Sequence, residues 1–137
     1  MKIGIMSDTH DRLPLINRAV ERLNDENVGS VLHAGDYSAP FVASRFKPLK
    51  AKLVGVFGNN DAEKGLLRQK FHDIGAQIRG IFAEVRVGNL KIALLHGEET
   101  ELLDSLVNAN SYDVVIHGHT HEAIIRRQGK TLVVNPG

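Results

Sequence analysis

The segment KIGIMSDTH, residues 2–10, begins as a short apolar strand and ends abruptly in polar residues. The same succession occurs at four later places along the chain. Those polar ends are His33-Ala34-Gly35-Asp36, Gly58-Asn59-Asn60-Asp61, His96-Gly97 and His117-Gly118-His119-Thr120-His121. Sites in open α/β sheets form beyond the carboxyl ends of the strands. We therefore expect the five polar ends to meet in one place.

Around these segments, short strands alternate with helices and are followed by hairpins. Strands are predicted at residues 2–6, 30–34, 52–57 and 113–116, with hairpins at 81–87 and 91–95 and at 123–127 and 131–134. Helices are predicted at 13–23, 40–46, 62–71 and 102–107, and we expect Ser38 to cap the second. This order predicts an α/β fold with parallel and antiparallel parts.

The composition is that of one globular domain over residues 1–137. The chain is 42% hydrophobic, carries a formal net charge of +1 and contains no cysteine. This balance excludes a disordered chain, a thiolate metal site and a strongly basic nucleic-acid binder. No segment approaches the roughly 20 apolar residues of a membrane span, so we expect a cytoplasmic protein with no membrane partner.

Seven histidines stand out beside two tyrosines and no tryptophan. Asp8 and His10 are separated by one residue, as are His119 and His121, a spacing that places both side chains on one side of an extended chain. Carboxylates, amide oxygens and imidazoles together suit Mn, Fe, Zn, Co or Ni. There are too many candidate ligands for one tetrahedral zinc, so two metal ions are the simpler interpretation.

The polar ends resemble the motifs of the calcineurin-like metallophosphoesterase superfamily, and the short chain is similar to its small bacterial and archaeal phosphodiesterases. The motifs are Asp-x-His, Gly-Asp, Gly-Asn-x-Asp, a His before Gly, and Gly-His-x-His, in this order between residues 7 and 121. The resemblance implies two mixed sheets packed as a sandwich, flanked by helices. It also implies that a metal-activated hydroxide attacks the phosphorus of a small phosphodiester in line.

The resemblance also implies a role for individual residues. The first metal ion is expected on Asp8, His10 and His121, and the second on Asn59, His96 and His119. Asp36 is expected to bridge the two ions. Mn²⁺ is the expected ion, with Ni, Zn, Fe, Co and Mg as alternatives.

The chain departs from the family pattern at two places. Asn60 stands where many members have a histidine that faces the leaving group, and an amide cannot protonate a leaving group. Because Asn60 cannot protonate a leaving group, we expect diesters to be preferred over alkyl monoesters. We assign catalytic roles to Asp36 and Asn60. The chain also ends at residues 135–137, where relatives continue with a final pair of strands. We expect those strands to be missing and the sequence to be either a minimal form or a fragment. Missing terminal strands would leave an unpaired sheet edge that can pair with a second chain, so a homo-oligomer is an open expectation.

Each polar residue also has a purely structural interpretation. Asp and Asn after strands are common turn residues. For His33 and His117 we favour packing at strand ends, and for His72 and Arg12 a solvated surface. Asp61 could anchor a ligand loop through backbone hydrogen bonds or simply cap a helix.

Two functions compete with the phosphodiesterase. One is a non-catalytic protein scaffold of the same fold, as in the related retromer subunit, and the other is a metal-binding regulator without turnover. Loss of a metal ligand would favour the scaffold, whereas all seven expected positions are filled here.

Overall fold

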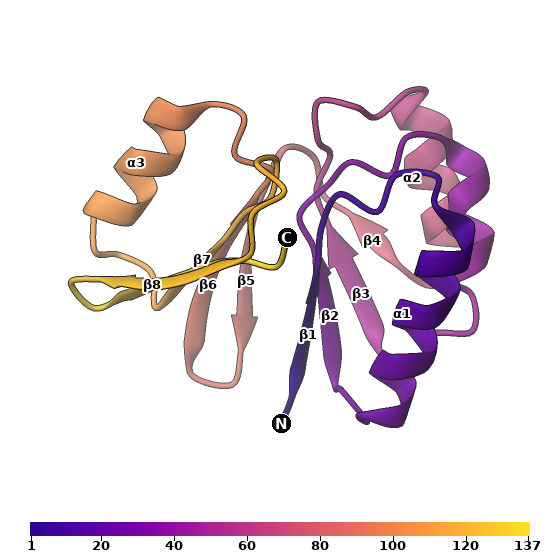
Figure 1. The fold of residues 1–137 in the computed structure, drawn as a ribbon, viewed down its shortest axis with the longest axis horizontal. Coiled ribbons are helices and arrows are strands. Elements are labelled where there is room, and N and C mark those ends of the chain that lie inside the picture. The colour runs from indigo at the N-terminus through magenta and orange to yellow at the C-terminus, as the bar shows by residue number, and fades with distance from the viewer.

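The computed structural model describes residues 1–137 as two sheets packed face to face, with helices on both outer sides (Figure 1). The first sheet is parallel throughout and has the order β1 (Ile3–Met6), β2 (Ser30–His33), β3 (Lys52–Gly55) and β4 (Gln77–Ile78). The second has the order β5 (Phe82–Val87), β6 (Leu90–Leu95), β7 (Val114–Ile116), β9 (Thr131–Asn135) and β8 (Ile124–Gln128). Its three central strands are parallel, and β5 and β8 are antiparallel edges.

Three apolar layers hold the sheets and helices together. The helices α1 (Leu13–Asp25), η1 (Pro40–Phe46) and α2 (Lys64–Asp73) cover the four-stranded sheet through a cluster that includes Ile16 and Phe71. A second cluster, which includes the fully buried Leu94, fills the space between the sheets, and a third lies under α3 (Thr100–Asn108). Full burial of one such side chain stabilises the fold by about 1.5–3 kcal/mol. The predicted α/β sandwich flanked by helices is confirmed, with only the second sheet mixed.

Several element boundaries differ from those predicted. The third strand ends at Gly55 rather than at residue 57, because the chain leaves the ladder with β2 there. The helix predicted at 62–71 lies at Lys64–Asp73. The prediction that Ser38 caps the helix over 40–46 is wrong, since Ala39 is the N-cap residue and no side chain caps this 3-10 helix. Strand β4 was not predicted because two residues cannot show an alternating pattern.

The parallel strands determine where the site forms. The carboxyl ends of β1, β2 and β3 share one edge of the first sheet, and those of β6 and β7 share one edge of the second. In Figure 1 the loops that follow these strands meet at the top of the molecule, between the sheets. None of the helices combines the length and the apolarity that a membrane crossing requires.

Candidate metal centre

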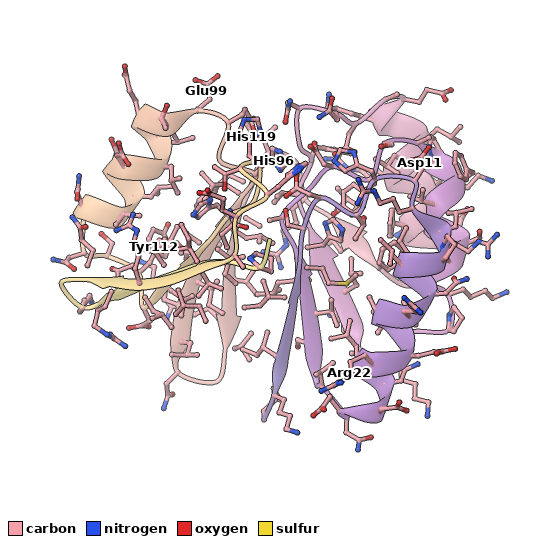
Figure 2. The ribbon with its side chains drawn as sticks, viewed as in Figure 1. Asp11, Arg22, His96, Glu99, Tyr112 and His119 are labelled. Carbon is pink, nitrogen blue, oxygen red and sulfur yellow. The ribbon has the colours of Figure 1, made fainter.

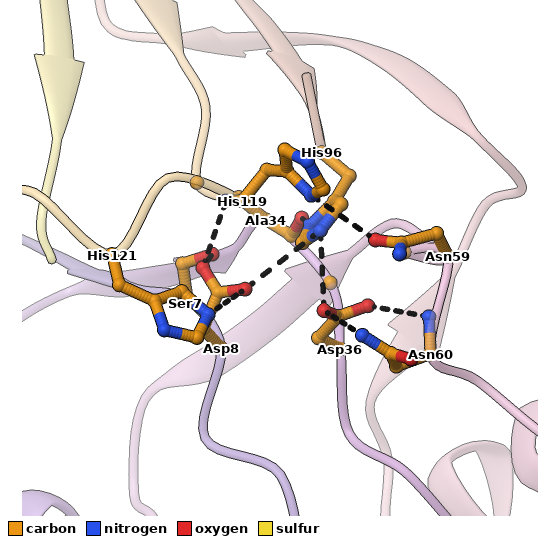
Figure 3. A network of polar contacts seen from close by, with 12 residues as sticks. Ser7, Asp8, Ala34, Asp36, Asn59, Asn60, His96, His119 and His121 are labelled. Carbon is orange, nitrogen blue, oxygen red and sulfur yellow. Dashed lines mark hydrogen bonds and ion pairs between the residues drawn. The ribbon is translucent and has the colours of Figure 1, made fainter. Parts of the chain in front are cut away.

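Seven polar side chains from five loops meet between the two sheets. Figure 2 shows His96 and His119 at the junction. Figure 3 shows at close range the side chains of Asp8, Asp36, Asn59, His96, His119 and His121. The four-stranded sheet contributes Asp8, His10, Asp36 and Asn59 through the loops after β1, β2 and β3. The five-stranded sheet contributes His96, His119 and His121 through the loops after β6 and β7. The structure therefore brings all seven predicted ligands together.

The two oxygens of the Asp8 carboxylate differ, because one accepts hydrogen bonds and the other accepts none. Oδ2 accepts hydrogen bonds from the Ser7 hydroxyl at 2.6 Å and from the His119 backbone N–H at 3.0 Å. Oδ1 is buried and has no hydrogen-bond partner. It lies 3.3 Å from His121 Nε2 and 3.7 Å from His96 Nε2, so two imidazoles from the opposite sheet face this oxygen (Figure 3).

Asp36 lies between two histidines and is almost fully buried. Its Oδ2 is 3.2 Å from His96 Nε2 and 3.8 Å from His10 Nε2. Asn60 donates to both oxygens, from its backbone N–H to Oδ1 at 2.8 Å and from its side chain to Oδ2 at 3.1 Å. Burial raises the pKa of Asp36, but His96 and the two Asn60 hydrogen bonds outweigh it and hold the pKa below its ordinary value. Asp36 is therefore ionised at neutral pH.

His96 is oriented by the backbone of the opposite sheet. Its Nδ1 lies 2.9 Å from the Ala34 carbonyl oxygen, so Nδ1 carries a proton and donates. Its Nε2 is buried and makes an ion-pair contact with Asp36 without hydrogen-bond geometry. Burial lowers the pKa of His96, but the Asp36 carboxylate and the Ala34 carbonyl raise it above the ordinary value. The raised pKa favours a proton on His96 in the chain without metal, and a cation could balance the carboxylates instead.

Five of the seven side chains form two tight groups. In each group, three potential ligand atoms lie within 4.8 Å of one another. The groups are Asp8 with His10 and His121, and Asp8 with Asp36 and His96. The remaining two residues contact each other, with Asn59 Oδ1 at 3.2 Å from His119 Nδ1, and the His119 ring lies 5.2 Å from the His96 ring.

The expectation that Asp8 and His10 lie in extended chain is wrong. Their φ angles are 54° and 48°, in the left-handed region, and Asp36, His119 and His121 share that region. Each non-glycine residue there costs roughly 1–2 kcal/mol. Backbone hydrogen bonds between loops offset this cost, since the Asp8 N–H donates to the Gly35 carbonyl and the His10 N–H to the Asp36 carbonyl. The paired side chains converge because of the loop conformation, and not because of strand geometry.

Asp61 anchors the loops after β2 and β3. Its carboxylate accepts the backbone N–H groups of Asp36, Tyr37, Ser38 and Gly58. The N-cap position of α2 is Glu63, and no side chain caps the helix, so Asp61 is a loop anchor and not a helix cap. The sequence left both interpretations open.

Two glycines permit the close approach of the loops. A Cβ atom on Gly58 would lie 2.1 Å from Asp36 Oδ1, and one on Gly118 would lie 1.8 Å from Ser7 Oγ and 2.4 Å from Asp8 Oδ2. Neither position can accept a side chain without displacing a carboxylate of the site.

Residues outside the seven fall into two classes. His33 is fully buried and does more than pack, since its Nδ1 accepts the Gly35 N–H and its Nε2 contacts the Thr9 hydroxyl at 3.0 Å. Burial lowers its pKa to about 3, so His33 is neutral and joins the loops after β1 and β2. His72 and Arg12 are exposed, as expected. His117 is buried, and desolvation lowers its pKa.

Asn135 supports a loop of the site, a role that the sequence did not reveal. Its side-chain amide donates to the Gly118 carbonyl at 3.1 Å and to the Thr120 hydroxyl at 3.0 Å. Asn135 thereby holds the loop that carries His119 and His121. No local signal marks this role, because the two segments meet only in the folded chain.

A model of the calcineurin-like phosphoesterase superfamily domain matches residues 1–137 of the chain. Phosphodiesterase MJ0936 of Methanocaldococcus jannaschii is 44% identical over 138 residues, which cover the whole chain and 83% of that protein. A solved structure of an archaeal phosphodiesterase is similar with a TM-score of 0.95 and 44% identity, covering 100% of this chain and 84% of that one.

A more distant likeness is to Vps29 of Entamoeba histolytica. One of its solved structures has a TM-score of 0.75 and 24% identity, and the match covers 100% of this chain and 74% of that one. At this level of identity the likeness shows a common fold only.

Proposed function

The chain belongs to the calcineurin-like phosphoesterase superfamily, and we propose that it hydrolyses small phosphodiesters with two divalent metal ions bound between its sheets. The phosphodiesterase name of the relative at 44% identity supports this substrate class. The observation that carries the proposal is that the buried atoms Asp8 Oδ1 and His96 Nε2 have no hydrogen-bond partner.

Each of these two atoms fits a cation held together with a neighbouring ligand atom. Asp8 Oδ1 lies 3.3 Å from His121 Nε2, and His96 Nε2 lies 3.2 Å from Asp36 Oδ2. Two ligand atoms at about 2.1 Å from one ion lie roughly 3–4 Å apart. A buried polar atom without a partner costs about 1–3 kcal/mol, which binding of a cation would recover. The nitrogen and oxygen donors suit Mn²⁺, with Ni, Zn, Fe, Co and Mg as alternatives.

The residues divide between the two ions as the family pattern implies. Asp8, His10 and His121 would hold the first, and Asn59, His96 and His119 the second. Asp36 would bridge them, because its Oδ2 faces both His10 and His96. When bound, such ions polarise phosphoryl oxygens and lower the pKa of a coordinated water. The charge of two divalent ions exceeds that of the two carboxylates, which favours an anionic phosphate.

The preference for diesters rests on Asn60. Its side chain donates to Asp36 Oδ2, so it fixes the proposed bridging carboxylate. An amide also cannot give a proton to a leaving group. Esters whose leaving groups need no protonation are therefore the expected substrates, and alkyl monoesters the poorer ones. The catalytic proposal is preferred to the scaffold because every expected ligand position carries a ligating side chain.

The test is hydrolysis of a chromogenic aryl phosphodiester with and without added Mn²⁺. We expect turnover only with the metal. Asp36→Asn should lower it at least about 100-fold, because both ions depend on this carboxylate. The matched control is Asp104→Asn, which changes an exposed carboxylate on α3. Equal rates for Asp36→Asn and the wild type, or turnover without metal, would contradict the proposal.

A further inference from the structure

Ser38 lies beside the candidate metal centre, and its hydroxyl does not cap the helix that follows it. It precedes η1, but Ala39 is the N-cap residue, and no side-chain cap is present. The Ser38 hydroxyl lies instead 3.2 Å from Nδ1 of His10, a residue 28 positions earlier in the chain.

The backbone of Ser38 is held in a costly conformation. Its φ is 75°, in the left-handed region, where a serine costs roughly 1–2 kcal/mol. Two hydrogen bonds keep it there, one from its N–H to Asp61 Oδ1 at 3.0 Å and one from the Ala62 N–H to its carbonyl at 3.1 Å. Asp61 also fixes the backbone of Asp36, so one carboxylate sets the positions of Ser38 and of the proposed bridging ligand.

The two ring nitrogens of His10 have separate neighbours. Nδ1 faces the Ser38 hydroxyl, whereas Nε2 faces Asp36 Oδ2 at 3.8 Å. A neutral imidazole has one N–H and one lone pair, and the hydrogen bond at one nitrogen decides which nitrogen is free to bind a metal. His96 meets the same requirement through the Ala34 carbonyl.

We propose that Ser38 is a positioning residue that accepts a hydrogen bond from His10 Nδ1 and so presents the lone pair of Nε2 to a divalent cation. The proposal rests on the metal centre proposed above. Ligating histidines in metalloproteins usually donate their second N–H to such a partner, and loss of that partner weakens metal binding about 10- to 100-fold. Ser38, unlike the Ala34 carbonyl, can be tested by substitution.

Two variants separate the hydroxyl from the backbone. Ser38→Ala removes the hydroxyl and keeps the left-handed strain, whereas Ser38→Gly removes the hydroxyl and relieves the strain. The matched control is Asn27→Gly, at an exposed residue with a φ of 54°. We expect both glycine variants to be at least as stable as the wild type in urea. Only the two Ser38 variants should bind Mn²⁺ about 10- to 100-fold more weakly.

A second readout uses the protein without metal. Long-range nitrogen–proton NMR at about pH 8, where an ordinary imidazole is neutral, reports which ring nitrogen carries the proton. We expect Nδ1–H for His10 in the wild type and a shift toward Nε2–H in both Ser38 variants. A wild-type His10 protonated at Nε2, or unchanged Mn²⁺ affinity in both variants, overturns the role of Ser38 alone. A wild type that binds no Mn²⁺ overturns the metal centre as well.

Discussion

The two sheets build their halves of the site in different ways. On the four-stranded sheet, Asp36 is 1% exposed, and Asp61 holds the surrounding loops through four backbone N–H groups. On the five-stranded sheet, the side chain of His121 is 60% exposed, and two hydrogen bonds from Asn135 support its loop. The carboxylate half is buried and fixed, whereas the histidine loop after β7 is exposed and lightly held.

The two halves meet at Asp8. Hydrogen bonds to a buried carboxylate favour its charged form. The loop after β7 contacts both oxygens of Asp8, because the His119 N–H donates to Oδ2 and His121 Nε2 lies 3.3 Å from Oδ1. The loops that carry Asp36 are therefore held by more side-chain hydrogen bonds than the loop after β7.

The largest expected effect comes from the anchor of the carboxylate half. Asp61→Asn replaces one carboxylate oxygen with an NH₂ group, which would face two of the four backbone donors. We expect a loss of about 3 kcal/mol in the free energy of unfolding, because buried donors lose their acceptor. Urea unfolding of the metal-free protein measures it, with Asp104→Asn as the control. Equal stability of the two variants would show that Asp61 does not organise these loops.

The next largest effect is the pH dependence of the free energy of unfolding that His33 causes in the carboxylate half. His33 has a pKa of about 3 in the folded chain, chiefly because it is buried, and an ordinary pKa near 6.5 when unfolded. Its contribution is complete above about pH 6.5 and is lost as the pH falls, because the unfolded chain then binds a proton that the folded chain does not. We expect a loss of about 2 kcal/mol between about pH 7 and about pH 5.

Other groups also titrate in this range, and His96 acts in the opposite direction because its pKa is raised. The measurement is therefore the difference between the wild type and His33→Gln, each unfolded in urea across this range without metal. The wild-type curve should fall more steeply as the pH is lowered. Parallel curves would show that His33 is not kept neutral by the fold.

The smallest effect is expected in the histidine loop. Asn135→Ala removes two hydrogen bonds from the loop after β7, but the Gly118 carbonyl keeps its contact with His117 Nδ1. We expect a loss of about 1 kcal/mol in unfolding free energy, below that of Asp61→Asn. Metal affinity should also fall, because the loop carries two proposed ligands. A cost equal to or above that of Asp61→Asn would reverse the comparison between the halves.

The sequence predicted those features that depend on a single strand and the residues that directly follow it. Apolar runs followed by Asp, Asn or His located all five loops, and periodicity located the helices covering the sheets. Asp8 and His10 were rightly expected to lie together, but the loops achieve this through left-handed backbone.

The supporting contacts could not be predicted, because they join distant segments. The His33–Thr9 contact spans 24 positions, and the His119–Asp8 hydrogen bond spans 111. Ser38 carried a misleading local signal, since serine before a proline-led turn resembles a helix cap. Its contact with His10 depends on how two strand ends are placed in three dimensions.

The central claim is that two metal ions bind between the sheets. The most direct measurement is elemental analysis of the Mn²⁺ retained per chain, for the wild type and for Asp36→Asn. We expect two ions per wild-type chain and loss of at least one in Asp36→Asn, because the bridging carboxylate is gone. A wild-type chain that retains one ion or none, or an Asp36→Asn chain that retains two, would contradict the account.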